Sequence, residues 1–129
     1  NYVQKRIARK PGGREKLLEF VNACIDFIAE NVDFYMVYLD VQGCFGTADE
    51  KRSMLEFVNS RTRELLTEII EQAKSEGTIR KGVSTRNLAD VVQAMVDGIQ
   101  SQIAAEPDGI DIPGCRRMFR EMIESHIAA

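Results

Sequence analysis

Apolar residues recur every three or four positions along nearly the whole chain, and no segment alternates apolar and polar residues as a β-strand does. Spacing of three and four places side chains on one face of an α-helix, because the helix turns once in about 3.6 residues. At 129 residues the chain can bury one hydrophobic core and is too short for a second. The sequence therefore predicts a single all-α domain of about six helices over residues 1–129.

A proline and glycine break separates the first two helices. A short helical pattern over residues 2–9 stops at the sequence PGG, which begins at Pro11 and whose glycines are interpreted as turn residues. The helix predicted over residues 14–31 carries one apolar stripe, and Phe20 and Phe27 add a second apolar face. A helix that is apolar on two faces is buried on both, so we expect it at the centre of the bundle.

Capping residues mark the later helices. Thr47 and Glu50 have the spacing of a capping box, in which each side chain bonds to the backbone N–H of the other residue. The long helix that begins there is predicted to end at Gly77, because glycine adopts the left-handed conformation of a helix end without steric cost. Ser84 or Thr85 is predicted to cap the next helix. A loop with the sequence EPDGIDIPG precedes the last helix.

Two further helices carry apolar stripes. The stripe of the long helix consists of Leu55, Val58, Thr62, Leu65, Leu66, Ile69 and Ala73. In the last helix, Cys115, Met118, Phe119, Met122, Ile123, His126 and Ile127 form the apolar face, and Arg116, Arg117, Arg120, Glu121 and Glu124 lie opposite. Charged residues on the opposite face of an amphipathic helix are expected to meet solvent.

Charge is distributed unevenly in a chain whose net charge is −3. The first sixteen residues contain six basic residues and one acidic residue, a charge of +5, and the remainder contains 11 basic and 19 acidic residues, a charge of −8. The basic end suits an acidic partner such as DNA, or it is an ordinary solvated helix end. The acidic remainder is not expected to bind nucleic acid. Charged residues interrupt every long apolar run, so no membrane span or membrane partner is predicted.

The three cysteines, Cys24, Cys44 and Cys115, lie far apart and have no CxxC spacing. This pattern disfavours a metal site or a disulfide framework and favours a reducing compartment, the cytoplasm. Small buried hydrophobic residues are the preferred interpretation, and a redox-sensing pair is the alternative. His126 is the single histidine, and no phosphate-binding glycine loop or nucleophile motif is present. We therefore predict that the chain is not an enzyme and has no cofactor or metal.

The segment IIEQAKSEGTIRKGVSTRNLADVVQAMVDGI resembles the C-terminal regulatory domain of TetR-family transcriptional regulators. In that family a long helix ends in a glycine after an acidic residue, an isoleucine-arginine pair follows, and a leucine-alanine pair opens a helix that contains a glycine. The matching positions are Glu76, Gly77, Ile79, Arg80, Leu88, Ala89 and Gly98. The sequence PGGREKLLEFVNACIDFI looks like the first regulatory helix of the family. Residues 1–10 look like the remnant of the helix that links to an N-terminal helix-turn-helix domain, which is missing here.

The resemblance implies an antiparallel helical bundle of the TetR C-terminal type, in which a small hydrophobic effector enters between the helices. It also implies a homodimer, formed by a four-helix bundle of the last two long helices and their symmetry mates. DNA would be contacted only through the missing N-terminal domain, and repression is the commoner mode of regulation in the family. The alternative function is a helical protein-interaction module that has no ligand.

Aromatic residues and a methionine on the expected pocket helices are the candidates for effector binding, together with nearby polar groups. The candidates are Phe20, Phe27, Tyr35, Tyr38, Phe45, Met54, Phe57 and Arg61, with Asn22, Asp26 and Asn59 as further polar positions. Each aromatic residue could instead be an ordinary core residue. A tyrosine is the better candidate, because a buried hydroxyl group needs a hydrogen-bond partner.

Small residues along one line of the helix that follows Ser84 would let another helix approach closely. A glycine inside a helix is less favourable than alanine by about 1 kcal/mol, so it commonly has a packing role. The candidates for the dimer interface are Val91, Ala94, Gly98 and Ser101 on this helix and Met118, Met122 and His126 on the last one.

Overall fold

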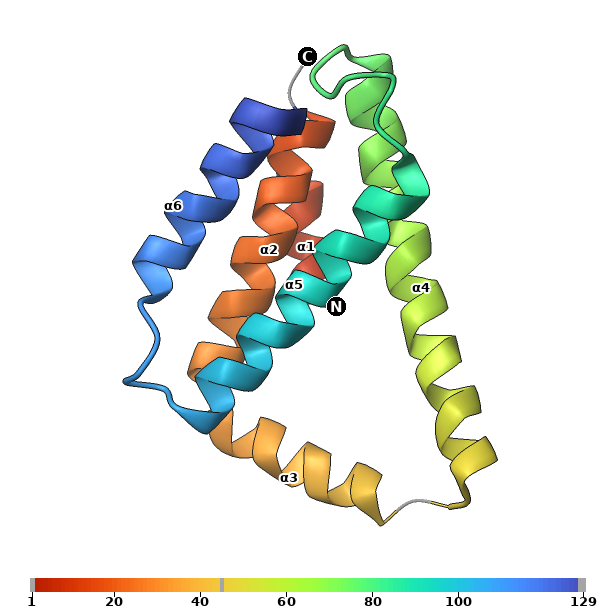
Figure 1. The fold of residues 1–129 in the computed structure, drawn as a ribbon, viewed down its shortest axis with the longest axis vertical. Helices are drawn as coiled ribbons and strands as arrows, with labels where there is room; N and C mark the ends of the chain where they lie inside the picture. The colour runs from red at the N-terminus through yellow and green to blue at the C-terminus, as the bar shows by residue number, and fades with distance from the viewer. Residues whose placement is uncertain (1, 45, 128–129) are drawn as a thin grey trace.

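The structure is a computed structural model that describes residues 2–44 and 46–127, without the side chains of Gln42 and His126. Over these residues it contains α-helices, one short π-helix and no strand (Figure 1). The elements are α1 (Tyr2–Ala8), α2 (Gly13–Glu30), α3 (Val32–Gly43), α4 (Ala48–Ser75), α5 (Thr85–Ala105), α6 (Ile112–Met122) and η1 (Ile123–Ile127). The all-α fold class is confirmed. None of the helices in this described part is long and apolar enough to cross a membrane.

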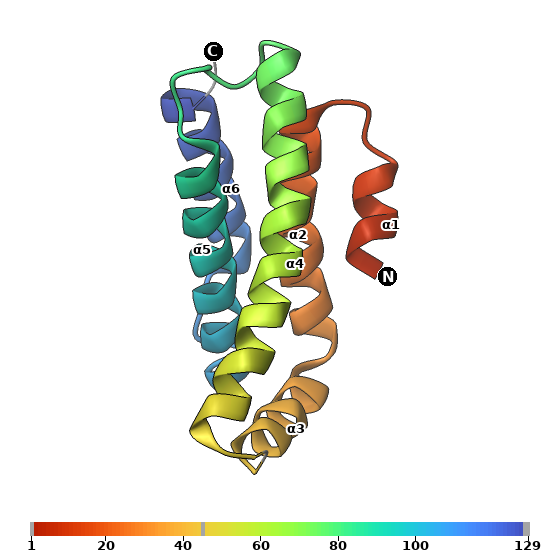
Figure 2. The same ribbon diagram turned by 90° about the vertical axis from the view of Figure 1, so that its right-hand side faces the viewer.

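Helix α2 is the central element of the fold. It packs against α1, α4 and α5, and its Leu17, Ile25 and Ile28 side chains are completely buried. Figure 2 shows α1 alongside α2, with α5 and α6 on the other side of α2. Helix α2 therefore lies at the centre of the bundle, as predicted, although Phe27 of its second apolar face is exposed.

The capping predictions are confirmed with one change. The Glu50 N–H donates to Thr47 Oγ1 at 3.2 Å, and α4 begins at Ala48. The Thr47 hydroxyl group donates in turn to the Glu50 carboxylate at 3.3 Å, so this carboxylate pairs with the hydroxyl group and not with the backbone. Ser84, and not Thr85, caps α5. Gly77 has a φ of +77°, the left-handed conformation expected just beyond the end of α4.

Gly13 has a packing role, so its interpretation as a turn residue was wrong. It is the first residue of α2 and is buried against α4. A Cβ atom on Gly13 would lie 2.3 Å from the Ala73 backbone nitrogen and 2.7 Å from the Ile69 carbonyl oxygen. The Gly13 N–H also donates to Glu76 Oε1 at 2.7 Å. The start of α2 is therefore held directly against the end of α4, at a distance that only glycine permits.

The first half of α4 does not belong to the core, which corrects the predicted stripe. Leu55 and Val58 are exposed, whereas Leu66, Ile69 and Ala73 in the second half are buried. Figure 1 shows the first half of α4 diverging from α5, with α3 crossing the lower end of the molecule. Only the second half of α4 packs closely against α2. The apolar stripe of α4 is therefore longer than the part of the helix that reaches the core.

One charged residue of α6 departs from its predicted face. Phe119 and Ile123 are buried, and Met118 and Met122, which are predicted for the dimer interface, are exposed in the single chain. Arg116, assigned to the solvent face by its charge, lies half-buried and bonds to α2. The contact face of α6 therefore includes an arginine and leaves two methionines outside.

Candidate functional site

A hollow of about 500 Å³ lies between α1, α2, α4 and α5. Its lining residues are Val3 and Gln4 of α1, Phe20 and Cys24 of α2, Val58, Asn59, Arg61, Thr62 and Leu65 of α4, and Gln93, Val96, Asp97 and Gln100 of α5. Two other hollows of similar volume are each lined by residues of one helix or its cap. A concave site walled by four helices is the better candidate for binding a small molecule, because it can surround a ligand.

Some of the residues predicted from the sequence line this hollow. Phe20 is buried to 4% exposure and forms part of the wall contributed by α2. Arg61 and the polar candidate Asn59 lie on the α4 wall. These three side chains provide an aromatic surface, a positive charge and an amide group within one site.

The other predicted effector residues lie outside this lining. Phe27 is exposed and stacks on Tyr2 with 5.9 Å between the ring centroids. Tyr35 and Met54 are half-buried, and Tyr38 is exposed. None of these four residues lines the hollow.

Phe57 and the remaining candidates also lie elsewhere. Phe57 is 62% exposed, and the Arg61 guanidinium carbon lies 5.7 Å from the centroid of its ring. Asn22 and Asp26 bond to Arg116 of α6 and therefore face away from the hollow. Phe45 lies outside the described residues.

The polar side of the hollow, which α5 provides, was not predicted from the sequence. Gln93, Asp97 and Gln100 are spaced by four and three residues, so they share one face of α5. The Gln93 amide donates to Asn59 Oδ1 at 2.8 Å, and the Gln100 amide donates to the Cys24 carbonyl oxygen at 3.2 Å. These bonds connect α5 to α4 and to α2. The spacing of the three polar residues was the signal that could have revealed this wall.

Burial changes the acidity of two groups in the lining. It raises the pKa of the Asp97 carboxyl group above its usual value, because desolvation disfavours the charged form. Burial, together with the negative charge of Asp97, raises the pKa of the Cys24 thiol to about 12. The thiolate is the reactive form of cysteine, so Cys24 remains an unreactive thiol at neutral pH. This favours the interpretation of Cys24 as a buried apolar residue over a role in redox sensing.

The residues predicted for the dimer interface lie at the surface of the single chain. Val91, Ala94 and Ser101 are exposed on α5, and Met118 and Met122 are exposed on α6. Among the described residues, apart from the chain neighbours of Gly98 and the adjacent backbone of α5, no atom lies within 4 Å of a Cβ atom built on Gly98. The His126 side chain lies outside the described part of the chain. In the part of the chain that the structure describes, the line of small residues on α5 is therefore largely exposed.

The sequence matches a known protein-family model. A protein-family model described as BetI-type transcriptional repressor, C-terminal, matches residues 13–128, which is nearly the whole chain. The chain has no match among curated proteins or solved structures.

Proposed function

Because the chain belongs to the family of BetI-type transcriptional repressor C-terminal domains, we propose that it is the effector-sensing and dimerisation domain of a transcriptional repressor. The proposal includes a cytoplasmic location and contact with DNA through an N-terminal domain joined to α1. Helix α1 is then the end of the linking helix. The observation that carries the proposal is the position of α1, whose Val3 and Gln4 side chains line the hollow.

The contacts of α1 suit a helix that responds to a ligand. Ile7 is its one side chain that is buried, and Arg6 holds it to α2 through Glu19 at 2.5 Å and Asp26 at 2.7 Å. A molecule in the hollow that contacts α1 binds more tightly to one position of this helix than to another. It thereby shifts the population toward that position, with a coupling free energy of typically about 1 to 3 kcal/mol.

The lining suits a small molecule that has an apolar body and hydrogen-bonding groups. Val58, Leu65 and Val96 provide apolar surface, while the amide groups of α4 and α5 and the charged groups of Arg61 and Asp97 provide polar contacts. Ligand sites of proteins commonly combine a largely apolar lining with a few polar groups that orient the ligand. Polar residues make up about half of this lining, so we expect an amphipathic effector with several hydrogen-bonding groups.

Filling the hollow with protein tests this assignment. Thr62 lies half-buried on the α4 wall, so Thr62→Trp is expected to occupy the space of the effector. Compounds that raise the melting temperature of the wild-type chain in a screen of small amphipathic metabolites should lose that effect on the variant. Ser53→Trp, at an exposed position of the same helix, is the control and should keep the effect. If stabilising compounds act equally on both variants, or if none is found, this hollow is not the effector site.

The dimer proposal is supported by the open space at Gly98. We expect Gly98→Leu to weaken the dimer by at least about tenfold, because a larger side chain separates two helices that pack closely. Gly82→Leu, which also enters open space, is the control and should leave the dimer intact. Sedimentation velocity over a concentration series measures the dimer dissociation constant of both variants. An unchanged dimer in Gly98→Leu would show that α5 packs elsewhere.

A protein-interaction module without a ligand is the second candidate, and the surface of α3 favours it. Phe34, Val37 and Val41 of this helix are exposed. Exposed apolar patches commonly mark interaction sites. The compound screen separates the two functions, because only the effector-sensing domain should lose compound binding when Thr62 is replaced by tryptophan.

A further inference from the structure

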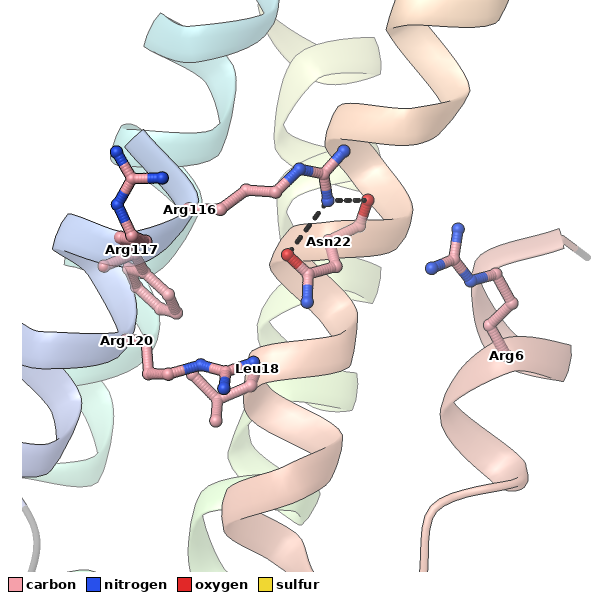
Figure 3. A pocket seen from close by; sticks show the side chains of 7 residues that line it. Arg6, Leu18, Asn22, Arg116, Arg117 and Arg120 are labelled. Atoms are coloured by element: carbon pink, nitrogen blue, oxygen red, sulfur yellow. Dashed lines mark hydrogen bonds between the residues drawn. The ribbon is translucent and has the colours of Figure 1, made fainter. Parts of the chain in front are cut away.

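A second hollow, of about 250 Å³, is lined by residues of α1, α2 and α6 (Figure 3). Four arginines line it: Arg6 of α1 and Arg116, Arg117 and Arg120 of α6. Leu18 and the buried Phe119 provide apolar surface. Figure 3 shows Arg116 and Arg120 extending from α6 toward α2. This arginine hollow shares no lining residue with the hollow proposed for the effector.

Two of the four guanidinium groups are held in place by neighbouring side chains. Arg116 donates to Asn22 Oδ1 at 3.0 Å and also to the Asp26 carboxylate. Arg6 donates to Glu19 Oε1 at 2.7 Å and to Asp26 Oδ2 at 2.7 Å. A guanidinium group that is already oriented loses little conformational entropy when it binds an anion.

The other two guanidinium groups have no carboxylate of their own. Within the part of the chain that the structure describes, Arg117 and Arg120 make no ion pair and no side-chain hydrogen bond. Both side chains are exposed. They are therefore free to turn toward a ligand in the hollow.

Positive charge exceeds negative charge in the lining of this hollow, although the chain as a whole has a net charge of −3. The carboxylates bonded to its arginines are Glu19 and Asp26, which leaves an excess of two positive charges over the four arginines. An adjoining hollow adds Lys10 and Glu15, whose charges cancel, and the hollow that shares Arg117 adds the acidic residues Asp111 and Glu121. Partial burial opposes ionisation of Asp26, but hydrogen bonds from Arg6 and Arg116 outweigh it and hold the pKa of this carboxyl group below its usual value. The charge balance therefore persists at neutral pH.

We propose that the arginine hollow binds a small oxyanion with at least two negative charges, carried by phosphate or carboxylate groups. Guanidinium groups match both kinds of oxyanion, because each can donate two parallel hydrogen bonds. The volume suits a compact anion better than a drug-sized molecule. The bound anion contacts residues of α1, α2 and α6 at once. This proposal does not depend on the effector proposal, and a separate experiment tests it.

Sodium pyrophosphate and sodium citrate are the probes, one for each oxyanion type, with sodium chloride at matched ionic strength as the reference. At least one probe should raise the melting temperature of the whole chain more than chloride does, and should give saturable binding by isothermal titration calorimetry. The probe that binds more tightly shows whether the site prefers phosphate or carboxylate groups. Arg117→Gln/Arg120→Gln should weaken that binding at least tenfold and still fold, because neither side chain has a described partner to lose.

The control variant removes the same amount of charge elsewhere. Arg52→Gln/Lys81→Gln replaces two exposed cations outside the hollow and should change the affinity by less than twofold. Equal weakening in both double variants would indicate general charge attraction and overturn the proposal. Binding of neither probe beyond chloride would also overturn it. So would an arginine variant that leaves anion binding unchanged and weakens self-association, because these arginines would then meet carboxylates of a second copy.

Discussion

Gly13→Ala is expected to lower the free energy of unfolding by about 3 kcal/mol and the melting temperature by roughly 10 °C. The added Cβ atom would lie 2.3 Å from the Ala73 backbone nitrogen and 2.7 Å from the Ala73 Cα atom. Backbone atoms inside α4 cannot rotate away as the end of a flexible side chain can. The two helices must therefore separate, which also weakens the bond from the Gly13 N–H to Glu76.

Urea denaturation monitored by circular dichroism measures this effect. Gly82→Ala is the matched control, because a Cβ atom there meets no atom within 4 Å and the backbone is not in the left-handed conformation. The control should change the free energy of unfolding by no more than about 0.5 kcal/mol. A Gly13→Ala variant as stable as this control would show that α2 and α4 do not approach each other as closely as described.

Phe20→Ala is expected to lower the free energy of unfolding by about 3 to 5 kcal/mol. Phe20 is 4% exposed and belongs to the core cluster, so its truncation loses buried apolar surface and leaves a cavity. Because Phe20 also lines the four-helix hollow, the same substitution enlarges the proposed effector site. Effector binding is therefore best compared with a variant that keeps more of the side-chain volume, such as Phe20→Leu.

Phe57→Ala is the matched control for this truncation. Phe57 is 62% exposed, so its removal should change the free energy of unfolding by no more than about 0.5 kcal/mol. Chemical denaturation of the two alanine variants, monitored by circular dichroism, provides the comparison. Similar losses of stability in both variants would contradict the placement of Phe20 in the core and Phe57 on the surface.

Helix ends were predictable because local interactions determine them. The Thr47 and Ser84 caps bond to backbone groups three residues away, and the turn at Gly77 needs one left-handed residue. The interactions that define each end therefore lie within about one helical turn. The two ends of α4 and the start of α5 followed from these residues with an error of about one position.

The candidate site was predictable only in part. Aromatic content identified Phe20, and polar residues on the same helices identified Asn59 and Arg61, all of which line the four-helix hollow. The spacing of residues in the sequence could not distinguish these lining residues from Phe27 and Phe57, which lie outside the hollow, because all of them recur at helical spacing. Whether an aromatic side chain meets a cavity, the core or solvent depends on the distance to the neighbouring helix. That distance is a property of the whole bundle.

The amino-acid sequence by itself determined the all-α class, the helix order and the central place of α2. The tertiary structure alone decided which glycine is in close contact: Gly13 lies against α4, while Gly98 has open space within the chain. It also decided that Arg116 turns toward α2 and that the first half of α4 leaves the core. Helical periodicity is encoded within single turns, whereas the approach of two helices depends on the packing of all the side chains between them.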